Sequence, residues 1–379
     1  MSPSDREEEN RVTAGYRFEQ WSGHAGLKES LPFWRTALEG CELDPLCNDP
    51  DWVLAYADAY CPDESLFGWR VSDASGEPIG FLAFRKEPAR GRFALRRAQL
   101  LADGTFDSDY IDLIIRPGHE AGVWAGALDA LATTKGVDAM HVNAVLADSP
   151  TVKALRELLE KRGLPSRSAI VECADAPLTE SFDDYLKTLK KRMRSKVRQA
   201  VRIAGEKGAT LAWCHDEASL DEHLEGLFRL HAMRWEESGE SGAFAEEGRR
   251  KLYKAFAHNA CKTGTLRFSR LDLDGQTVAY QFGARAGDRY YQMQEGYHTD
   301  FADARVATAL RALSIQHLID EGVRQYDFMA GMSRHKRDWG GAARDCISIA
   351  FALPNVRARL SYGARAFVDR WREKRATSA

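Results

Sequence analysis

Residues 275–341 read GQTVAYQFGARAGDRYYQMQEGYHTDFADARVATALRALSIQHLIDEGVRQYDFMAGMSRHKRDWGG, and this stretch decides the fold. It contains two runs rich in strand-forming residues, Thr277–Ala286 and Arg289–Gly296. Between them stands Gly287-Asp288, a pair whose backbone preferences suit a tight hairpin turn. The sequence therefore predicts a β-hairpin here.

A helix and a third strand are expected to follow the hairpin. Apolar spacing predicts a helix over Arg305–Glu321, ended by Gly322 as a C′ residue. Val323–Met329 has the composition of a strand, and Arg334–Arg337 that of an exposed basic loop. The order is β-β-α-β, and ligands favour the crevice that such a crossover leaves at the strand ends.

Length and composition place the chain among ordinary globular proteins. It has 379 residues, 44% of them hydrophobic and 29% charged, which suggests two domains with real cores. The net charge of -3 provides no general attraction for nucleic acid. Seven scattered cysteines without a CxxC pair argue against a disulfide framework or a zinc site. We expect no metal cofactor.

The sequence also bears on location. Its N-terminus is acidic and polar, unlike a signal peptide, and no apolar run approaches the roughly 20 residues needed to span a bilayer. We therefore expect a cytoplasmic protein without an integral membrane segment.

The first half of the chain repeats the order of elements in the second. Strands are expected at Leu66–Val71, Pro78–Phe84, Arg97–Leu101, Tyr110–Ile115 and Ala139–Val145, with a helix at His119–Lys135. Both halves place a helix that ends at Gly-Val before a strand, which favours a duplicated α/β unit. The alternative is that any strand–helix–strand unit shows this pattern. The expected fold is α/β (α+β), with mixed sheets flanked by helices.

The predicted parts follow from these patterns. They are a disordered tail at 1–15, a domain at 16–175, a linker and basic amphipathic helix at 176–210, a domain at 211–355, and a basic helix at 356–379. Between Lys187 and Lys207 there are nine Lys or Arg residues and one acid, with apolar residues at helical spacing. This helix either bridges two domains in solvent or contacts phosphates of a nucleotide, a tRNA or another acidic surface.

Several short motifs resemble a known family. LFRLHAMRW (227–235), YYQMQEGYHTDF (290–301), YDFMAGMSRHKRDWG (326–340) and, in the first half, PLCNDPDWVLAYADAY (45–60) and SDYIDLI (108–114) carry the resemblance. They are similar to the CelD-type, BioF2-like acyltransferases of the GNAT superfamily, which are related to the FemAB peptidyltransferases. The resemblance implies two tandem GNAT-like domains. It also implies transfer of an acyl group from acyl-CoA to an amine or hydroxyl acceptor, in cellulose, exopolysaccharide or cell-envelope production.

The resemblance also implies where acyl-CoA binds. The pyrophosphate would lie on the helix start formed by Arg305, Val306, Ala307 and Thr308. Unpaired N–H groups and the helix dipole make such a start an anion site. The family commonly has glycine where Ala307 stands, and Tyr-Lys where this chain has His335-Lys336.

Three residues are the main catalytic candidates. Lys336 could stabilise charge on the acyl oxygen, and His335 could supply or accept a proton. Glu295, expected to face the same way as Tyr291 and Met293, could deprotonate the acceptor. The alternatives are a surface lysine, a surface histidine and a solvated strand residue. If Lys336 is catalytic, Lys336→Ala is expected to lower kcat and leave stability nearly unchanged.

Further candidates have stronger structural alternatives. His298 follows the strand that carries Glu295 and is a second base candidate. Asp327 could orient a base or act as a strand-end hydrogen-bond partner. His231, Arg234 and Trp235 are substrate-binding candidates, although His231 lies on an apolar stripe typical of a core histidine.

Three functions remain open on the sequence. An acyltransferase would act on a small-molecule, glycan or peptidyl acceptor. A FemAB-like enzyme would take an aminoacyl group from tRNA, which the basic helix favours. A non-catalytic assembly partner is favoured by the departures at Ala307 and His335, and a cleft filled by aromatic side chains would support it. No GxxxxGK, HExxH or GxSxG motif supports other chemistries.

Overall fold

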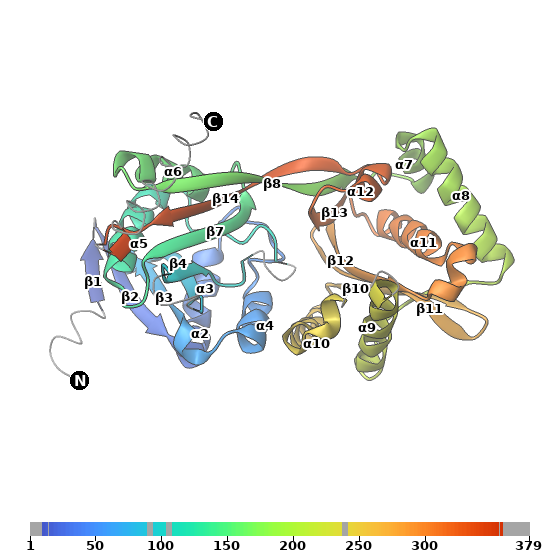
Figure 1. Ribbon diagram of the computed structural model, residues 1–379, viewed down its shortest axis with the longest axis horizontal. Helices are drawn as coiled ribbons and strands as arrows, with labels where there is room; N and C mark the ends of the chain where they lie inside the picture. The colour runs from blue at the N-terminus through green and yellow to red at the C-terminus, as the bar shows by residue number, and fades with distance from the viewer. Residues whose placement is uncertain are drawn as a thin grey trace, which may run out of the picture. The chain divides into compact units, whose positions relative to one another are not determined.

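The computed structural model describes residues 10–13, 15–88, 94–103, 108–236, 242–355 and 357–358. The chain forms two compact units, Met1–Val171 with Asp345–Ala379, and Glu172–Arg344 (Figure 1). Both units contain β-strands with helices packed on them, so the predicted α/β class is confirmed. Strands β8 (Ser166–Pro177) and β14 (Ala342–Ala352) each run from one unit into the other. β14 enters the first unit at Asp345, whereas the sequence placed the end of the second domain at residue 355.

The first unit contains a sheet in the order β1-β2-β3-β4-β5-β7-β14, with β6 paired to β4. Its elements are β1 (Asn10–Thr13), β2 (Tyr16–Ser22), α2 (Gly23–Glu29), α3 (Leu31–Leu38), α4 (Pro50–Tyr60), η1 (Asp63–Ser65), β3 (Leu66–Ser72), β4 (Pro78–Lys86), β5 (Arg97–Leu100), β6 (Ile114–Ile115), α5 (Glu120–Thr133), β7 (Ala139–Leu146) and α6 (Pro150–Lys161). β5 and β7 pair in parallel, and the other pairings described are antiparallel.

Two expectations for this unit differ from the structure. The tail expected to be disordered contains β1, which pairs with β2; residues 1–9 and 14 lie outside the described part. The strand expected over Tyr110–Ile115 is confined to Ile114–Ile115, because Tyr110 has a φ of 65° and its N–H donates to Ala144 O (3.0 Å). All but two residues of the expected helix at 356–379 also lie outside the described part.

The second unit contains the order β8-β13-β12-β11-β10-β9. Its elements are α7 (Phe182–Thr188), α8 (Lys191–Glu206), β9 (Thr210–Trp213), α9 (Leu220–Glu236), η2 (Ala243–Ala245), α10 (Glu247–Lys262), β10 (Leu266–Leu273), β11 (Gln276–Ala286), β12 (Arg289–Tyr297), η3 (Thr299–Ala304), α11 (Val306–Asp320), β13 (Gln325–Ala330) and α12 (Arg334–Asp338). The hairpin β11–β12, the helix α11 and the strand β13 confirm the predicted β-β-α-β order.

Local capping explains two further differences. The basic segment forms two helices, α7 and α8, because Leu189 and Lys190 adopt extended backbone angles. Ser181 caps α7 as expected and accepts a hydrogen bond from Asp184 N (3.1 Å). The segment expected to be a basic loop is the short helix α12, whose N-cap Ser333 accepts from Lys336 N (3.2 Å).

Helix α11 is covered on two sides. It packs on β10, β11 and β12 with one side and on α8 with the other. Ile315 and Leu318 belong to one core cluster, and Ala309 and Leu310 to a second. The helix is therefore held between the sheet and α8, which fixes the direction of its polar side chains.

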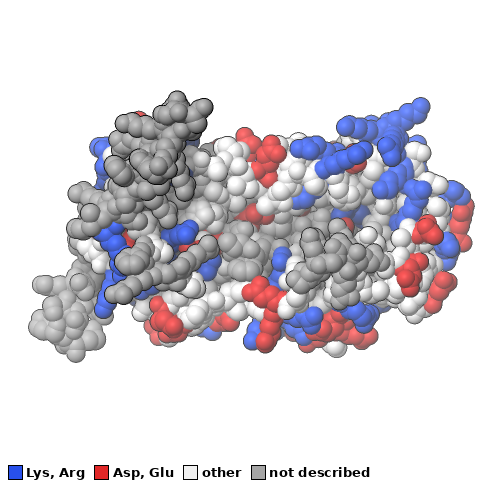
Figure 2. Space-filling model, in the orientation of Figure 1, with Lys and Arg blue, Asp and Glu red and all other residues white. Residues whose placement is uncertain are grey.

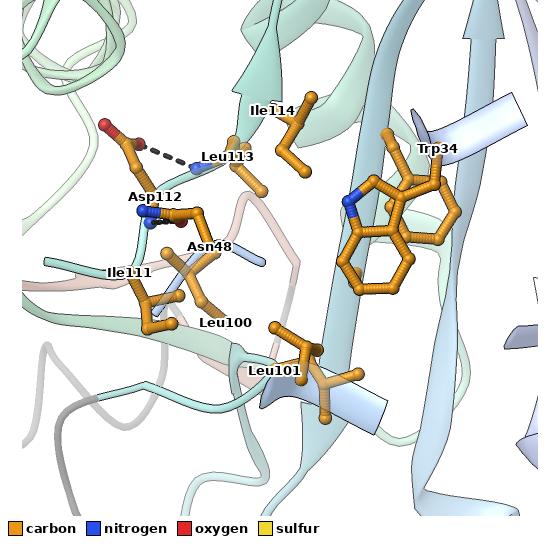
Figure 3. Close-up of a pocket in the computed structure, with 11 residues that line it drawn as sticks. Trp34, Asn48, Leu100, Leu101, Ile111, Asp112, Leu113 and Ile114 are labelled. Atoms are coloured by element: carbon orange, nitrogen blue, oxygen red, sulfur yellow. Dashed lines mark hydrogen bonds between the residues drawn. The ribbon is translucent and has the colours of Figure 1, made fainter. Parts of the chain in front are cut away.

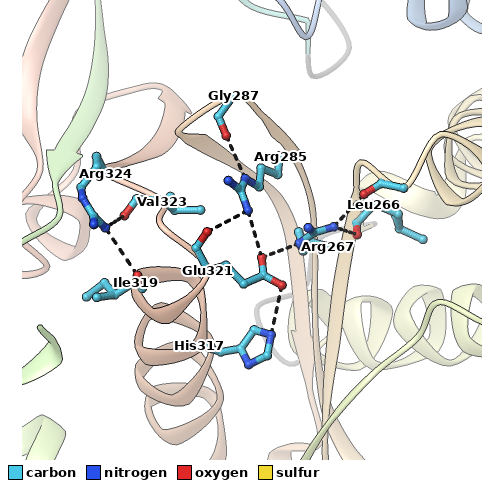
Figure 4. A network of polar contacts seen from close by, with 10 residues as sticks. Leu266, Arg267, Arg285, Gly287, His317, Ile319, Glu321, Val323 and Arg324 are labelled. Carbon is cyan, nitrogen blue, oxygen red and sulfur yellow. Dashed lines mark hydrogen bonds and ion pairs between the residues drawn. The ribbon is translucent and has the colours of Figure 1, made fainter. Parts of the chain in front are cut away.

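A polar network anchors the C-terminal end of α11 to the sheet (Figure 4). The carboxylate of Glu321 accepts from Arg267 Nε (2.8 Å) and contacts His317 Nε2 (3.2 Å), while Arg285 Nη1 donates to Glu321 O (3.1 Å). The carboxylate is shared among several partly buried cations, so the network restrains the helix more than an isolated surface ion pair would. The N-terminal end of α11 is thereby held in a fixed direction.

No helix in the described part of the chain is both long enough and apolar enough to cross a bilayer.

Candidate active site

The site lies where two parallel strands separate. β12 and β13 are in register from Arg289 opposite Gln325 to Tyr291 opposite Asp327, and their registered pairs end there. Beyond this point both strands continue toward their carboxyl ends. In α/β sheets, ligands bind in the crevice outside such strand ends.

A cavity of about 540 Å³ occupies this place. It is lined by Lys196 of α8, His231 of α9, Gln292, Met293, Gln294, Glu295 and Tyr297 of β12, Ala307, Thr308 and Arg311 of α11, Phe328 of β13, and Ser333, His335 and Lys336. We call this cavity the transfer pocket. Most of its lining residues carry polar groups, and it is an open cleft, not one filled by aromatic side chains.

A β-bulge decides which side chains enter the transfer pocket. Opposite Phe282 and Gly283, β12 carries one extra residue, Met293. Because Glu295 pairs with Gln281 and Gln292 pairs with Gly283, Glu295 and Gln292 share the face toward α11. Glu295 was expected to face the same way as Tyr291 and Met293. It lies on the opposite face from Tyr291, because strict alternation ignores the bulge, while Met293 lines the same pocket.

Arg311 is the centre of the polar contacts in the transfer pocket. It is 3% exposed and donates to both Glu295 Oε2 and His335 Nε2. Its guanidinium lies over the rings of Phe328 (5.6 Å) and Trp339 (5.4 Å), as cation–π contacts require. Burial acts to lower the pKa of Arg311, but the Glu295 carboxylate, Tyr326 and Tyr185 together outweigh it, so the pKa is raised and the side chain is charged.

Arg311 was not among the candidates from the sequence, although the sequence contains a signal for it. Arg311 lies one and two turns before Ile315 and Leu318, on an apolar stripe of α11. Arginine is rarely fully buried unless it is paired, so a lone cation on such a stripe indicates a buried polar partner. That partner, Glu295, was already a candidate.

Lys336 is bound to the end of β13. Its Nζ donates to Phe328 O (2.7 Å), Met329 O (3.1 Å) and Ala330 O (2.6 Å), and an ammonium group has three hydrogens to donate. It is therefore not a plain surface lysine, and its removal is expected to cost about 1–3 kcal/mol of stability. A catalytic role for Lys336 stays a prediction.

The remaining candidates are distributed around the site. Asp327 is buried outside the transfer pocket, where it accepts from Arg289 Nη1 (3.0 Å) and Met329 N (2.7 Å) and stabilises the irregular end of β13. His298 Nδ1 lies 3.9 Å from Asp300 Oδ2, and His298 does not line the transfer pocket. His231 is buried against Phe244 and lines the pocket. The side chains of Arg234 and Trp235 lie outside the described residues.

A second cavity, of about 400 Å³, lies at the start of α11. It is lined by Lys196, Tyr297, Ala302, Asp303 and the four residues predicted to bind the donor phosphates, Arg305, Val306, Ala307 and Thr308. We call it the anion cavity. Arg305 has left-handed backbone angles, and the first turn of α11 contains no acidic residue.

The anion cavity fits a phosphate group chemically. The first N–H groups of a helix have no intrahelical acceptor, and the helix dipole adds partial positive charge there. Lys196 and Arg305 supply two cations, against the single carboxylate of Asp303. Lys196, Tyr297, Ala307 and Thr308 line both cavities, so the anion cavity adjoins the transfer pocket.

Metal ligation has no support among the described residues, where no group of three or more His, Cys, Asp or Glu side chains is placed to hold an ion. The chemistry available in the transfer pocket is that of a carboxylate, an imidazole and their arginine partner.

Fold and site together define a class of protein: a two-unit α/β protein whose second unit opens a polar pocket and an anion cavity beside two separating parallel strands. Residues 191–337 match the model of the acetyltransferase (GNAT) domain. The GNAT domain model therefore covers most of the second unit. A comparison with curated protein sequences gives no significant match.

Solved structures share the fold over most of the chain. FemX is 13% identical, with 86% of this chain and 96% of FemX covered and a TM-score of 0.60. A conserved protein of unknown function from Bacteroides thetaiotaomicron is 13% identical over 86% and 97% of the chains, with a TM-score of 0.53. The C-terminal domain of a putative lysylphosphatidylglycerol synthetase from Agrobacterium fabrum is 10% identical over 88% and 95%, with a TM-score of 0.50. At these identities the likeness concerns the fold alone.

Proposed function

We propose that the protein is an N- or O-acyltransferase that moves an acyl group from acyl-CoA to an amine or hydroxyl acceptor. The observation that carries this proposal is the adjoining pair of cavities in one GNAT-type unit. The anion cavity suits the phosphates of the donor, and the transfer pocket holds a carboxylate where the acceptor would be deprotonated. Both lie at the carboxyl ends of β12 and β13.

The chemical step assigns Glu295 as the base. The acceptor nitrogen or oxygen bonds to the thioester carbonyl carbon, and its proton passes to Glu295 directly or through one water. The carbon–sulfur bond then breaks, and the thiolate leaves with a proton from His335 or solvent. Arg311 holds Glu295 in place before the reaction, because it is a buried cation bonded to one of its oxygens.

Calorimetry and turnover test this proposal. We expect heat on titration with acetyl-CoA or long-chain acyl-CoA, and release of free thiol when an acceptor is added. The double variant Lys196→Ala/Arg305→Ala should weaken donor binding, while Arg250→Ala, on α10 and outside both cavities, should not. No heat with either donor would contradict the thioester route. Screening amines, hydroxyls, glycans and peptidyl amines with the best donor then identifies the acceptor.

A second candidate is transfer of an aminoacyl group from tRNA. The observation that favours it is the basic surface of α8, where Lys191, Arg192, Lys196, Arg198 and Arg202 are exposed (Figure 2). Lys196 continues this surface into the anion cavity. RNA binding that falls steeply with salt, and that is lost on neutralising Lys190, Lys191, Arg194 and Arg198, would support this route.

A non-catalytic assembly role is the weakest of the three functions. It was expected to show a cleft filled by Trp or Phe side chains, whereas the transfer pocket has a volume of about 540 Å³ and Phe328 is the only such residue in its described lining. An enzyme that binds thioesters but transfers to no acceptor in a broad screen would return attention to this role.

A further inference from the structure

We propose that Arg311 is a positioning residue. It fixes His335 as the neutral tautomer protonated at Nδ1, and it holds Glu295 by a hydrogen bond to one carboxylate oxygen. This inference deepens the proposed function and rests on it for its catalytic consequence. The tautomer itself follows from contacts alone. The sequence analysis assigned no role to Arg311.

The tautomer follows from the donors that an arginine has. A guanidinium group carries N–H donors only and accepts no hydrogen bond. Because Arg311 Nη1 bonds to His335 Nε2, that ring nitrogen must be the acceptor. A neutral imidazole has one acceptor and one donor nitrogen, so the proton of His335 is on Nδ1.

The same guanidinium fixes Glu295. Its Nη2 donates to Glu295 Oε2, so a planar fork joins the carboxylate to the imidazole. The rings of Phe328 and Trp339 pack against the fork, and Tyr185 OH donates to the backbone oxygen of Trp339 (2.8 Å), which restrains the backbone that carries this ring. Arg311 has little freedom to reorient, because it is nearly fully buried within this frame.

Fixing both partners separates their roles in acyl transfer. His335 Nε2 cannot act as the base while Arg311 occupies its lone pair, so deprotonation of the acceptor falls to Glu295. The only proton that His335 can donate, to the developing oxyanion or to the leaving thiolate, is the one on Nδ1. The Tyr-Lys pattern of the resembling family is replaced here by an imidazole whose tautomer is set from α11.

Nitrogen NMR of the wild-type protein labelled with ¹⁵N-histidine tests the tautomer without any substrate. We expect the His335 signal, assigned by its loss in His335→Gln, to show an unprotonated Nε2 and a protonated Nδ1. In Arg311→Met the two tautomers should mix. A protonated Nε2 in the wild type, or an unchanged tautomer in Arg311→Met, would overturn the proposal.

Kinetics tests the catalytic consequence. Arg311→Lys keeps the charge but lacks the planar fork, so kcat should fall about 10- to 100-fold while KM for the thioester stays within about twofold. Arg162→Met removes an arginine–carboxylate pair in the first unit and is the matched control, with wild-type kcat and tautomer. A wild-type kcat in Arg311→Lys would overturn the positioning role. If no thioester is turned over but the tautomer is as stated, the proposed function fails and the tautomer assignment stands.

Discussion

Both units contain a parallel strand pair with three registered residue pairs, and they use the space beyond it differently. In the second unit β12 and β13 part and leave the transfer pocket of about 540 Å³. In the first unit β5 and β7 part after Gln99 and His141. There the segment that contains Tyr110, Ile111 and Leu113 is buried against the sheet, and a cavity of only about 20 Å³ lies beside it (Figure 3).

The two units also place a carboxylate at the same sequence distance after their parallel strand pairs. Asp103 follows the last paired residue of β5, Gln99, by four positions, as Glu295 follows Tyr291 in β12. Asp103 is fully buried and accepts from Asn143 Nδ2 (3.1 Å), and burial raises its pKa to about 7. Glu295 lines an open pocket and is paired with Arg311.

The starts of the helices that follow, α5 and α11, also differ between the two units. α5 begins with Glu120, whose carboxylate accepts from Gly118 N (2.9 Å), and Tyr16 OH contacts the preceding His119 (2.9 Å). The equivalent start of α11 has no acid and faces the anion cavity. In the first unit, groups of the chain itself therefore bind the start of α5. In the second unit, the start of α11 faces the anion cavity.

The largest effect is expected from exchanging the pocket carboxylate. Glu295→Gln removes the base, so kcat should fall by about 10²- to 10⁴-fold. The matched variant in the first unit, Asp103→Asn, should leave turnover unchanged. Steady-state kinetics on both variants, with circular dichroism to normalise for folded protein, makes the comparison. Equal losses in both variants would show that the two units do not differ in the proposed way.

Asp103→Asn should instead change stability, in a pH-dependent manner. The folded protein holds the Asp103 proton up to pH of about 7, whereas an unfolded carboxyl loses it near its ordinary value of 3.8. The wild type therefore loses unfolding free energy as pH rises between these values, by at most about 4 kcal/mol. Denaturant unfolding should show Asp103→Asn as the more stable protein at pH 8 and show no difference near pH 4. A gain that is the same at both pH values would contradict this account.

A smaller effect is expected at the two helix starts. Arg305→Ala removes one cation from the anion cavity and should raise the KM for acyl-CoA about tenfold, the equivalent of about 1.4 kcal/mol. Glu120→Gln removes the acid from the first turn of α5 and should cost about 0.3–1 kcal/mol of stability without changing that KM. An unchanged KM in Arg305→Ala would mean that the donor phosphates bind elsewhere.

Much of the second unit could be predicted because its signals are local. The turn Gly287-Asp288 and the apolar faces of α11 depend on residues a few positions apart, and the structure has them where expected. The start of α11 was likewise predictable as an anion site, since orphaned N–H groups are a property of any helix start.

The rest of the candidate site depends on contacts between distant residues. The bulge at Met293 reverses the face of Glu295, and nothing in the local pattern of β12 marks it. Arg311 meets Glu295 across the helix–sheet interface, and Lys336 bonds to carbonyls of β13. The first unit was harder to predict. Residues 110–113 have the composition of a strand, but in the structure they are buried without forming one, and Tyr110 has left-handed backbone angles.

The smallest effect, and the finest test of the comparison, concerns Ala307. Its methyl group lies at the first turn of α11 and lines both cavities, where it limits the approach of a phosphate to the backbone. Ala307→Gly should lower the KM for acyl-CoA by about two- to fivefold, at a stability cost below about 1 kcal/mol. Ala309→Gly, in the same helix but buried in the core, should cost stability without lowering the KM. If neither glycine variant binds the donor more tightly, the phosphates do not reach the backbone of this turn, and Lys196 and Arg305 hold them through their side chains alone.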